Sequence, residues 1–539
     1  MESLKALERL STLPKDKAVD ISRVVYAGHS RGGHGALLLG VKLPDLSCGI
    51  VASNGWIRRE YYADANPIFE HDLSLSHAFP FIVRQVFESS ISENDVGLTS
   101  ENIVDIPITI RTCSDDQSVS PWFMRRMARI LSSNGIQNLE FRELNRNLGH
   151  WWWDTKKTND GGALFDPFLR KRYVSAFKNC NSRLQTFRKN NSFTVVSLNP
   201  STFHGKHGIR ILSQDRAMAF SKIHCNFMAK SSAMQASGGG LLTLKTKNVL
   251  RFKINLENLI WRDDNASSSS YPISLVVDDD LFHHQKLMFL LDNQSSTEII
   301  FVRDKTAAKW SALPQGRRQS LIGTEWRLRH LYGPMRRVFD SNFLVVVGTR
   351  SEEDYASNVE AATYIANSHF AAQHTRVLIV HDTDLKRQDA MKYNLILVGG
   401  RRSNRWTTTV MEEGQLQGKP FPDIKIPSQS EELFRIGNCV YNESIVNAAL
   451  LVPWYPGEHD HARLALIISG KGSNLHKLLA SMSFSSNVPL TRAIFTNMLP
   501  DYMVTSKNFQ WKGLGGINAA GYWDSKWSYD ERVGFCNNV

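Results

Sequence analysis

Cysteines are few and widely scattered in this chain of 539 residues. Six are present and no two of them form a C-x-x-C pair: Cys48, Cys113, Cys180, Cys225, Cys439 and Cys536. Such spacing is typical neither of a zinc site nor of a small scaffold built on disulfides. We therefore expect reduced thiols.

Long hydrophobic runs are also lacking. No run reaches the roughly 18 apolar residues that a membrane helix needs, and residues 1–20 lack the apolar core of a secretory signal. Leucines recur there at helical spacing instead, which predicts an amphipathic helix: Leu4, Leu7, Leu10 and Leu13. These absences predict a protein without a membrane span that stays in the cytoplasm by default.

Motifs for cofactors, metals and nucleic acids are missing or incomplete. No phosphate-binding loop and no G-x-G-x-x-G after a strand is present, so no cofactor is predicted. Residues 458–461 (Glu-His-Asp-His) have metal-ligand side chains, but neighbours in an extended loop point in opposite directions, so we favour a solvated loop and predict no metal site.

The net charge of +12 is spread over short clusters, which favours a solvated surface over a nucleic-acid partner. One cluster, residues 399–405, could bind an anion at a helix start.

The chain is too long for one hydrophobic core, and its patterning changes twice. Up to residue 185, buried-strand and helical patterns alternate, as in a parallel sheet. Residues 186–325 alternate apolar and polar side chains, which indicates an antiparallel sheet. Residues 326–539 return to the first pattern and predict a Rossmann-like or flavodoxin-like layer domain. The predicted fold class is α/β with three domains, 1–185, 186–325 and 326–539.

Individual elements follow from the same patterns. In the first domain we predict strands over 23–28, 48–53, 106–113 and 138–144, and a helix over 121–135 that has proline in its first turn and glycine past its end. In the third domain the predicted buried strands include 343–350, 376–382 and 394–400.

A candidate nucleophile lies between the first strand and the helix that follows it. Residues 28–32 (Gly-His-Ser-Arg-Gly) match G-x-S-x-G in the strand, turn and helix context that this motif requires. A sharp turn exposes the hydroxyl of Ser30, and the flanking glycines avoid clashes with neighbouring backbone. The backbone N–H of Arg31 would lie at the helix N-terminus, where it could stabilise an oxyanion.

A serine hydroxyl also needs a base and a carboxylate that orients the base. Asp115 and Asp116 follow the strand 106–113, and His150 follows the strand 138–144, so the residues occur in the order Ser, Asp, His of α/β-hydrolases. We predict a triad of Ser30, His150 and one of the two aspartates. Either aspartate could instead cap the helix at 121–135, and His150 beside three tryptophans could be a packed core residue.

Two further histidines lie close to the candidate nucleophile in sequence. A base adjacent to Ser30 in the chain cannot easily reach its hydroxyl. We therefore expect His29 and His34 to support the site structurally.

The motifs around these residues resemble the catalytic domain of the prolyl oligopeptidase family of serine peptidases. The resemblance rests on "GHSRGGHGA", "IPITIRTCSDDQSVSPWFMRRMARIL" and "LEFRELNRNLGHWWW" and covers about residues 1–180. It implies an α/β-hydrolase fold with Ser30 as nucleophile and His150 as general base. The family's D-D-x-x-V loop implies Asp115 as the catalytic acid, with Val119 in the valine position and Asp116 as the fallback.

The rest of the chain resembles the C-terminal extension of some large hydrolases of this group, which implies no activity of its own. The family's catalytic domain normally begins with several strands that carry the second oxyanion donor, and an N-terminal β-propeller often precedes it. Neither is recognisable, so we hypothesise that the sequence is truncated at its N-terminus.

Three functions stay open. The first is a serine peptidase that hydrolyses peptide bonds through an acyl-enzyme. The second is a carboxylic ester hydrolase with the same residues, and the third is an inactive fragment that serves as a binding or structural module. The predicted partner is accordingly a peptide or small ester substrate.

Overall fold

The computed structural model describes residues 22–58, 81–144, 149–151, 167–178, 180, 192–228, 240–255, 273–283, 298–313, 326–416, 420–425, 433–457, 462–470 and 499–538. The amphipathic helix expected over Leu4 to Leu13 lies outside these residues, as does the loop 458–461.

The first sheet consists of four strands in the order β1-β2-β3-β4, and their parallel pairing is the one that the sequence predicts. They are β1 (Val24–His29), β2 (Ser47–Ser53), β3 (Ile108–Cys113) and β4 (Leu139–Leu144). Three helices accompany them, α2 (Arg31–Lys42), α5 (Trp122–Ser133) and α6 (Pro167–Lys178). Helices α2 and α5 share one apolar core with the strands, whereas Leu169 and Tyr173 of α6 pack against Val51 in a separate cluster. The sheet is thus covered on both faces, which suits its apolar strands.

Two further sheets pack face to face in the middle of the chain. One has the order β11-β10-β8-β7-β5 and the other β13-β12-β9-β6. They contain β5 (Ser192–Ser197), β6 (Ile209–Gln214), β7 (Ser221–Met228), β8 (Gly240–Lys247), β9 (Val249–Asn255), β10 (Ile273–Val277), β11 (Asp280–Phe282), β12 (Glu298–Arg303) and β13 (Trp310–Leu313). Side chains of both sheets, among them Ile223 and Phe301, form one core. The pairing is antiparallel except between β8 and β10.

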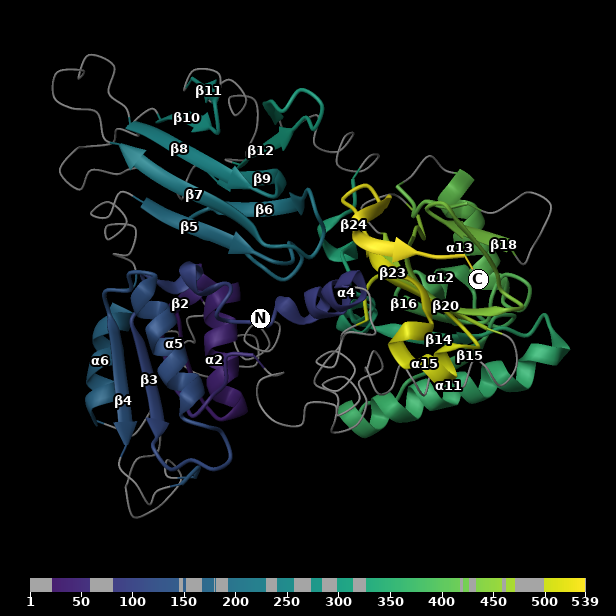
Figure 1. Ribbon diagram of the computed structural model, residues 1–539, viewed down its shortest axis with the longest axis horizontal. Coiled ribbons are helices and arrows are strands. Elements are labelled where there is room, and N and C mark those ends of the chain that lie inside the picture. Colours follow the sequence, from purple (N-terminus) through teal and green to yellow (C-terminus); the bar gives the residue numbers. More distant parts are fainter. Residues whose placement is uncertain are drawn as a thin grey trace.

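This sandwich contacts the amino-terminal edge of the first sheet (Figure 1). The backbone N–H of His204 donates to Lys42 O at 3.1 Å, at the end of α2. The ammonium of Lys206 lies 2.7 Å from Asp105, just before β3. Loops at the carboxyl ends of β1, β3 and β4, where the triad is predicted, leave the sheet at the opposite edge.

The third part contains an eight-stranded sheet in the order β15-β14-β16-β21-β20-β22-β23-β24. Its strands are β14 (Phe343–Val347), β15 (Ile379–His381), β16 (Asn394–Val398), β20 (Val446–Trp454), β21 (Arg463–Ser469), β22 (Tyr502–Ser506), β23 (Ile517–Trp523) and β24 (Tyr529–Cys536). A small sheet of β17 (Ile424–Lys425), β18 (Leu433–Ile436) and β19 (Cys439–Asn442) lies beside it. The main helices are α11 (Glu352–Gln373) and α13 (Arg405–Leu416). Shorter ones are α12 (Arg387–Ala390), α15 (Phe509–Lys512) and the 3₁₀ segments η11 (Arg329–Leu331), η12 (Met335–Asp340) and η14 (Gly513–Gly516).

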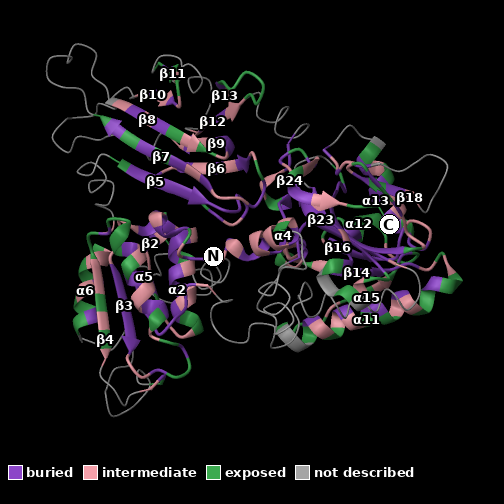
Figure 2. Cartoon of the chain, viewed as in Figure 1, coloured by how far each residue is buried: buried purple, intermediate pink, exposed green. Residues whose placement is uncertain are grey.

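The sheet of this third part is only half parallel. Strands β15, β14, β16 and β21 pair in parallel, whereas β20 to β24 pair antiparallel. The Rossmann-like or flavodoxin-like layer that the sequence predicts is therefore consistent only with the parallel half of this sheet. Figure 2 shows the central strands as buried, but β15 at the edge is largely exposed, although its sequence predicts a buried strand.

Helix α4 (Phe81–Ser92) extends from the first sheet domain toward the third (Figure 1). Its Val83, Val86 and Phe87 belong to the core of the eight-stranded sheet. This helix therefore belongs to the first domain in sequence and to the third in packing.

Two disulfides correct the expectation of reduced thiols. Cys48 of β2 pairs with Cys180, and Cys439 of β19 pairs with Cys536 of β24. The partners are 132 and 97 residues apart, so spacing along the chain gave no signal of either bond. Cys113 and Cys225 are buried and form no disulfide within the described part of the chain. Among the described helices, none is both long and apolar enough to cross a lipid bilayer.

Candidate active site

Ser30 occupies the turn between β1 and α2 with a strained backbone. Its φ of 56° lies in the left-handed region, which non-glycine residues adopt mainly under structural constraint. Two backbone hydrogen bonds hold the turn: Ser30 N–H donates to Ser53 O at 2.9 Å, and His34 N–H donates to Ser30 O at 3.2 Å. A Cβ on Gly28 would lie 2.0 Å from the carbonyl oxygen of Gly32, so the turn requires glycine there.

His150 is hydrogen bonded to Asp116. The Nδ1 atom of His150 lies 2.7 Å from Oδ2 of Asp116, and both residues are buried, with 8% and 4% exposure. The other carboxylate oxygen of Asp116 accepts the backbone N–H groups of Ser118 and Val119, each at 2.8 Å. The turn that ends at Val119 thus fixes the Asp116 carboxylate, which leaves Oδ2 to face the imidazole.

Asp115 has different partners. Its Oδ1 accepts the thiol of Cys113 at 2.8 Å and the backbone N–H of Gly149 at 3.3 Å. The structure therefore brings the fallback residue Asp116, and not the first choice Asp115, to His150. The physical reason is the turn, which directs the two adjacent side chains to different neighbours.

Asn54 is a site residue that the sequence did not reveal. It follows β2, is fully buried and has a φ of 45°. Its Nδ2 donates to Oδ2 of Asp116 at 2.5 Å, the same oxygen that contacts His150. Asparagine tolerates the left-handed conformation better than most residues, so the pair Asn54-Gly55 directly after a predicted strand was the available signal.

The imidazole of His29 links the His150 loop to the Ser30 turn. The ring centroids of His29 and His150 are 4.8 Å apart, and Trp151 packs against both rings. Burial and, secondly, the charge of His150 lower the pKa of His29 to about 4. His29 is therefore neutral at neutral pH. Because it directly precedes Ser30, its contact brings the base loop to the nucleophile turn.

The remaining sequence candidates take simpler positions. His34 stacks on Trp56 and its Nδ1 lies 2.9 Å from Trp56 O, so it supports the chain behind the turn. Arg31 is the first residue of α2 and its side chain is exposed, which leaves its backbone N–H at the helix N-terminus.

The possible anion site at residues 399–405 is not supported. Asn404 Oδ1 accepts the N–H groups of Trp406 and Thr407, and Asp382 Oδ2 accepts that of Arg405. Side chains thus already bind the donors of the first turn of α13. No group of three or more potential metal ligands occurs within the described part of the chain.

No protein-family model matches the chain, and the search of curated proteins finds no match. Parts of it are similar to an S-formylglutathione hydrolase from Agrobacterium tumefaciens (17% identity over 33% of this chain and 55% of that one, TM-score 0.22). Parts are also similar to an acylaminoacyl peptidase from Pyrococcus horikoshii (13% identity over 31% of this chain and 25% of that one, TM-score 0.23). A third similar structure is a puromycin-hydrolyzing peptidase from Mycobacterium tuberculosis (18% identity over 28% of this chain and 20% of that one, TM-score 0.21). The chain thus spans between 20% and 55% of the length of these structures. Similarities at this level assign neither a fold nor an activity to it.

Proposed function

We propose that the protein is a serine hydrolase that cleaves acyl bonds, with Ser30 as nucleophile, His150 as general base and Asp116 as the residue that orients the base. The hydrogen bond between His150 and Asp116, beside the strained Ser30 turn, is the observation that carries this proposal. The more specific assignment, a peptidase of the prolyl oligopeptidase type, rests on the sequence motifs around these residues.

The proposed reaction assigns one step to each of these groups. Ser30 Oγ attacks the carbonyl carbon of the substrate while His150 takes the hydroxyl proton. Asp116 accepts the Nδ1–H of His150 and stabilises the imidazolium that forms. The N–H of Arg31 at the start of α2 donates to the oxyanion of the tetrahedral intermediate. His150 then protonates the leaving amine or alcohol, and a water activated by His150 hydrolyses the acyl-enzyme.

An active-site-directed fluorophosphonate tests this proposal. We expect covalent labelling of the full chain that Ser30→Ala abolishes. Cys225→Ala is a suitable labelling control, since Cys225 lies in the core of the sandwich and not in the first sheet domain. Labelling that persists in Ser30→Ala, or folded protein that is not labelled at all, would contradict a hydrolase centred on Ser30.

Substrate panels distinguish peptide from ester hydrolysis. A peptidase is expected to turn over peptide amides as well as acyl esters, because esters are the chemically easier substrates of the same triad. Turnover of esters alone would replace the peptidase assignment with that of a carboxylic ester hydrolase.

A further inference from the structure

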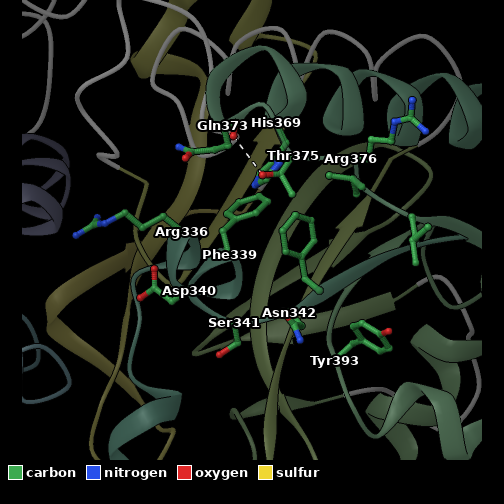
Figure 3. Close-up of a pocket in the computed structure, with 13 residues that line it drawn as sticks. Arg336, Phe339, Asp340, Ser341, Asn342, His369, Gln373, Thr375, Arg376 and Tyr393 are labelled. Atoms are coloured by element: carbon green, nitrogen blue, oxygen red, sulfur yellow. Dashed lines mark hydrogen bonds between the residues drawn. The ribbon is translucent and has the colours of Figure 1, made fainter. Parts of the chain in front are cut away.

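A cavity of 710 Å³ lies at the eight-stranded sheet, lined entirely by residues between 336 and 393 (Figure 3). Sites for small organic molecules typically measure about 300–1,000 Å³. Figure 3 shows His369, Gln373, Thr375 and Arg376 along one side, Asp340, Ser341, Asn342 and Tyr393 along the other, and Phe339 between them. Nothing in the proposed hydrolase chemistry uses this cavity.

Aromatic rings form one wall of the cavity. The imidazole of His369 is stacked on Phe339, with centroids 5.8 Å apart, and meets Phe343 edge-on at 5.0 Å. Phe339 and Phe343 also contact each other edge-on at 5.0 Å. His369 is buried, whereas both phenylalanines stay half-buried although they belong to a well-packed region. A flat ring entering the cavity would extend this cluster by stacking or edge contacts.

The charges at the cavity leave one cation without a counter-ion. Arg336 is bound to Glu93, and Asp340 lies 3.0 Å from Arg337. Burial lowers the pKa of His369, partly opposed by a backbone hydrogen bond with Thr375, so the imidazole adds no charge at neutral pH. Arg376 is exposed and has no ion-pair partner within the described part of the chain. An anionic group on a ligand would supply a counter-ion for the Arg376 guanidinium.

The carboxyl end of α11 also borders the cavity, and its free carbonyl groups would repel an anion. Two of these carbonyl groups already accept hydrogen bonds. His374 N–H donates to Phe370 O at 2.8 Å, and the Thr375 hydroxyl donates to Gln373 O at 3.1 Å. These bonds reduce the negative potential at the helix end, beside which Arg376 follows.

We propose that this cavity binds a small planar aromatic carboxylate, with its ring against Phe339 and Phe343 and its carboxylate on Arg376. The aromatic wall selects the ring, and the planar guanidinium selects the carboxylate by a two-point hydrogen bond. The site is a second binding function of the chain and does not depend on the proposed hydrolase activity.

Titrations of the full chain with three probes, followed by ligand-observed NMR, test the two halves of this recognition. The probes are 2-naphthoate, its neutral analogue 2-naphthamide, and cyclohexanecarboxylate, which keeps the charge but lacks the aromatic ring. We expect 2-naphthoate to bind about tenfold more tightly than 2-naphthamide, the effect of one charge-assisted contact, and more tightly than cyclohexanecarboxylate, which lacks the contacts of the aromatic ring. Equal binding of 2-naphthoate and 2-naphthamide, or no saturable binding of 2-naphthoate, would overturn the proposal.

Substitution of one exposed arginine tests whether the preference for the carboxylate arises at this cavity. Arg376→Gln is expected to reduce the preference for 2-naphthoate over 2-naphthamide to about threefold or less, because the charge is lost but folding does not depend on this side chain. Arg405→Gln removes another exposed arginine, at the start of α13, and is expected to keep the full preference. An Arg376→Gln variant that keeps the full preference would contradict the proposed site.

Discussion

The two oxygens of Asp116 have different partners. Oδ1 accepts two backbone N–H groups of its own turn, and Oδ2 contacts both His150 and Asn54. A carboxylate held by the backbone at one oxygen cannot rotate freely, so its second oxygen keeps a fixed direction. The orientation of the His150 ring therefore depends on the turn of residues 116–119 as well as on Asp116 itself.

Separate substitutions of Asp115 and Asp116 distinguish their roles. Asp116→Asn is expected to lower kcat by about 10⁴-fold, because an amide facing Nδ1 favours the wrong tautomer of the imidazole. Asp115→Asn changes a neighbouring residue of the same size and charge and is expected to keep kcat within about tenfold. Hydrolysis of an activated ester gives kcat, and circular dichroism checks folding. Equal losses in both variants would contradict the assignment of Asp116.

A second prediction concerns the buried imidazole of His29. Its pKa of about 4 in the folded chain lies below its ordinary value of 6.5, so the unfolded chain binds more protons between these pH values. Stability should therefore fall as the pH decreases from about 6.5 to 4. His29→Gln removes this proton and should shrink the decrease in Tm between pH 7 and pH 5, as measured by thermal denaturation. An unchanged decrease would show that His29 is equally solvated in both states.

Much of the candidate site could be predicted from single residues. Ser30 and His150 follow from a motif and from strand order, because both depend on local chain patterns. The family's loop pattern favoured Asp115 over Asp116, but the partner of His150 depends on which side chain the turn directs inward, and that side chain is Asp116. Asn54 escaped prediction because its role follows from a left-handed backbone and from a contact 62 residues away.

The turn from β1 to α2 shows how an element positions a side chain. Its backbone approaches itself so closely that Gly28 has no room for a methyl group, whereas nothing lies within 4 Å of a Cβ on Gly35. Gly28 lies at the end of β1, just before the Ser30 turn, and Gly35 lies inside α2, and of these two only Gly28 is sterically required.

Alanine substitution at these two glycines gives opposite expectations. Gly28→Ala should destabilise the protein by more than about 2 kcal/mol and abolish fluorophosphonate labelling, because the new methyl group meets backbone that cannot move aside. Gly35→Ala lies in the helix and should stabilise the protein by about 0.5–1 kcal/mol, since glycine is a poor helix former. Urea denaturation measures both. Comparable stability of the two variants would show that the turn can relax.

Strands could be predicted from the sequence where the pattern of apolar residues in the strand itself was enough to identify them. The four strands of the first sheet are apolar runs between helices, and their parallel order follows from the alternation of strands and helices. The antiparallel half of the eight-stranded sheet was not predictable, because long buried strands such as β20 read alike in either pairing. Strand β15 is exposed because it lies at the sheet edge, which no local pattern reveals. The domain boundaries near residues 185 and 325 stay predictions.

Glu93 joins all three parts of the molecule. It follows α4, its Oε2 accepts the amide of Asn199 beside β5 at 2.8 Å, and its Oε1 is bound by Arg336 of η12. Arg336 also donates to the hydroxyl and carbonyl of Ser90 at 3.0 and 2.8 Å. Burial alone would raise the pKa of Glu93, but the charges of Arg336, Lys42 and Arg337 outweigh it and lower the pKa to about 2.

Loss of the Arg336 side chain should destabilise the folded chain. Arg336→Met leaves a buried carboxylate with too few partners and is expected to lower the free energy of unfolding by about 3–5 kcal/mol. Arg125→Met breaks an exposed pair with Glu143 and should lower it by at most about 1 kcal/mol. Denaturation by guanidinium chloride at pH 7 measures both.

The pH dependence separates the ion pair from lost packing. In the wild type, Glu93 stabilises the fold above its ordinary pKa of 4.5, and this contribution is lost as the pH falls toward 2. In Arg336→Met the folded-state pKa of Glu93 rises, so stability should decrease less between pH 5 and pH 3 than in the wild type. If Arg336 acted only by packing, both proteins would lose the same stability over this range. Adding Glu93→Gln to Arg336→Met should then recover part of the loss at pH 7, because the uncompensated buried charge is gone.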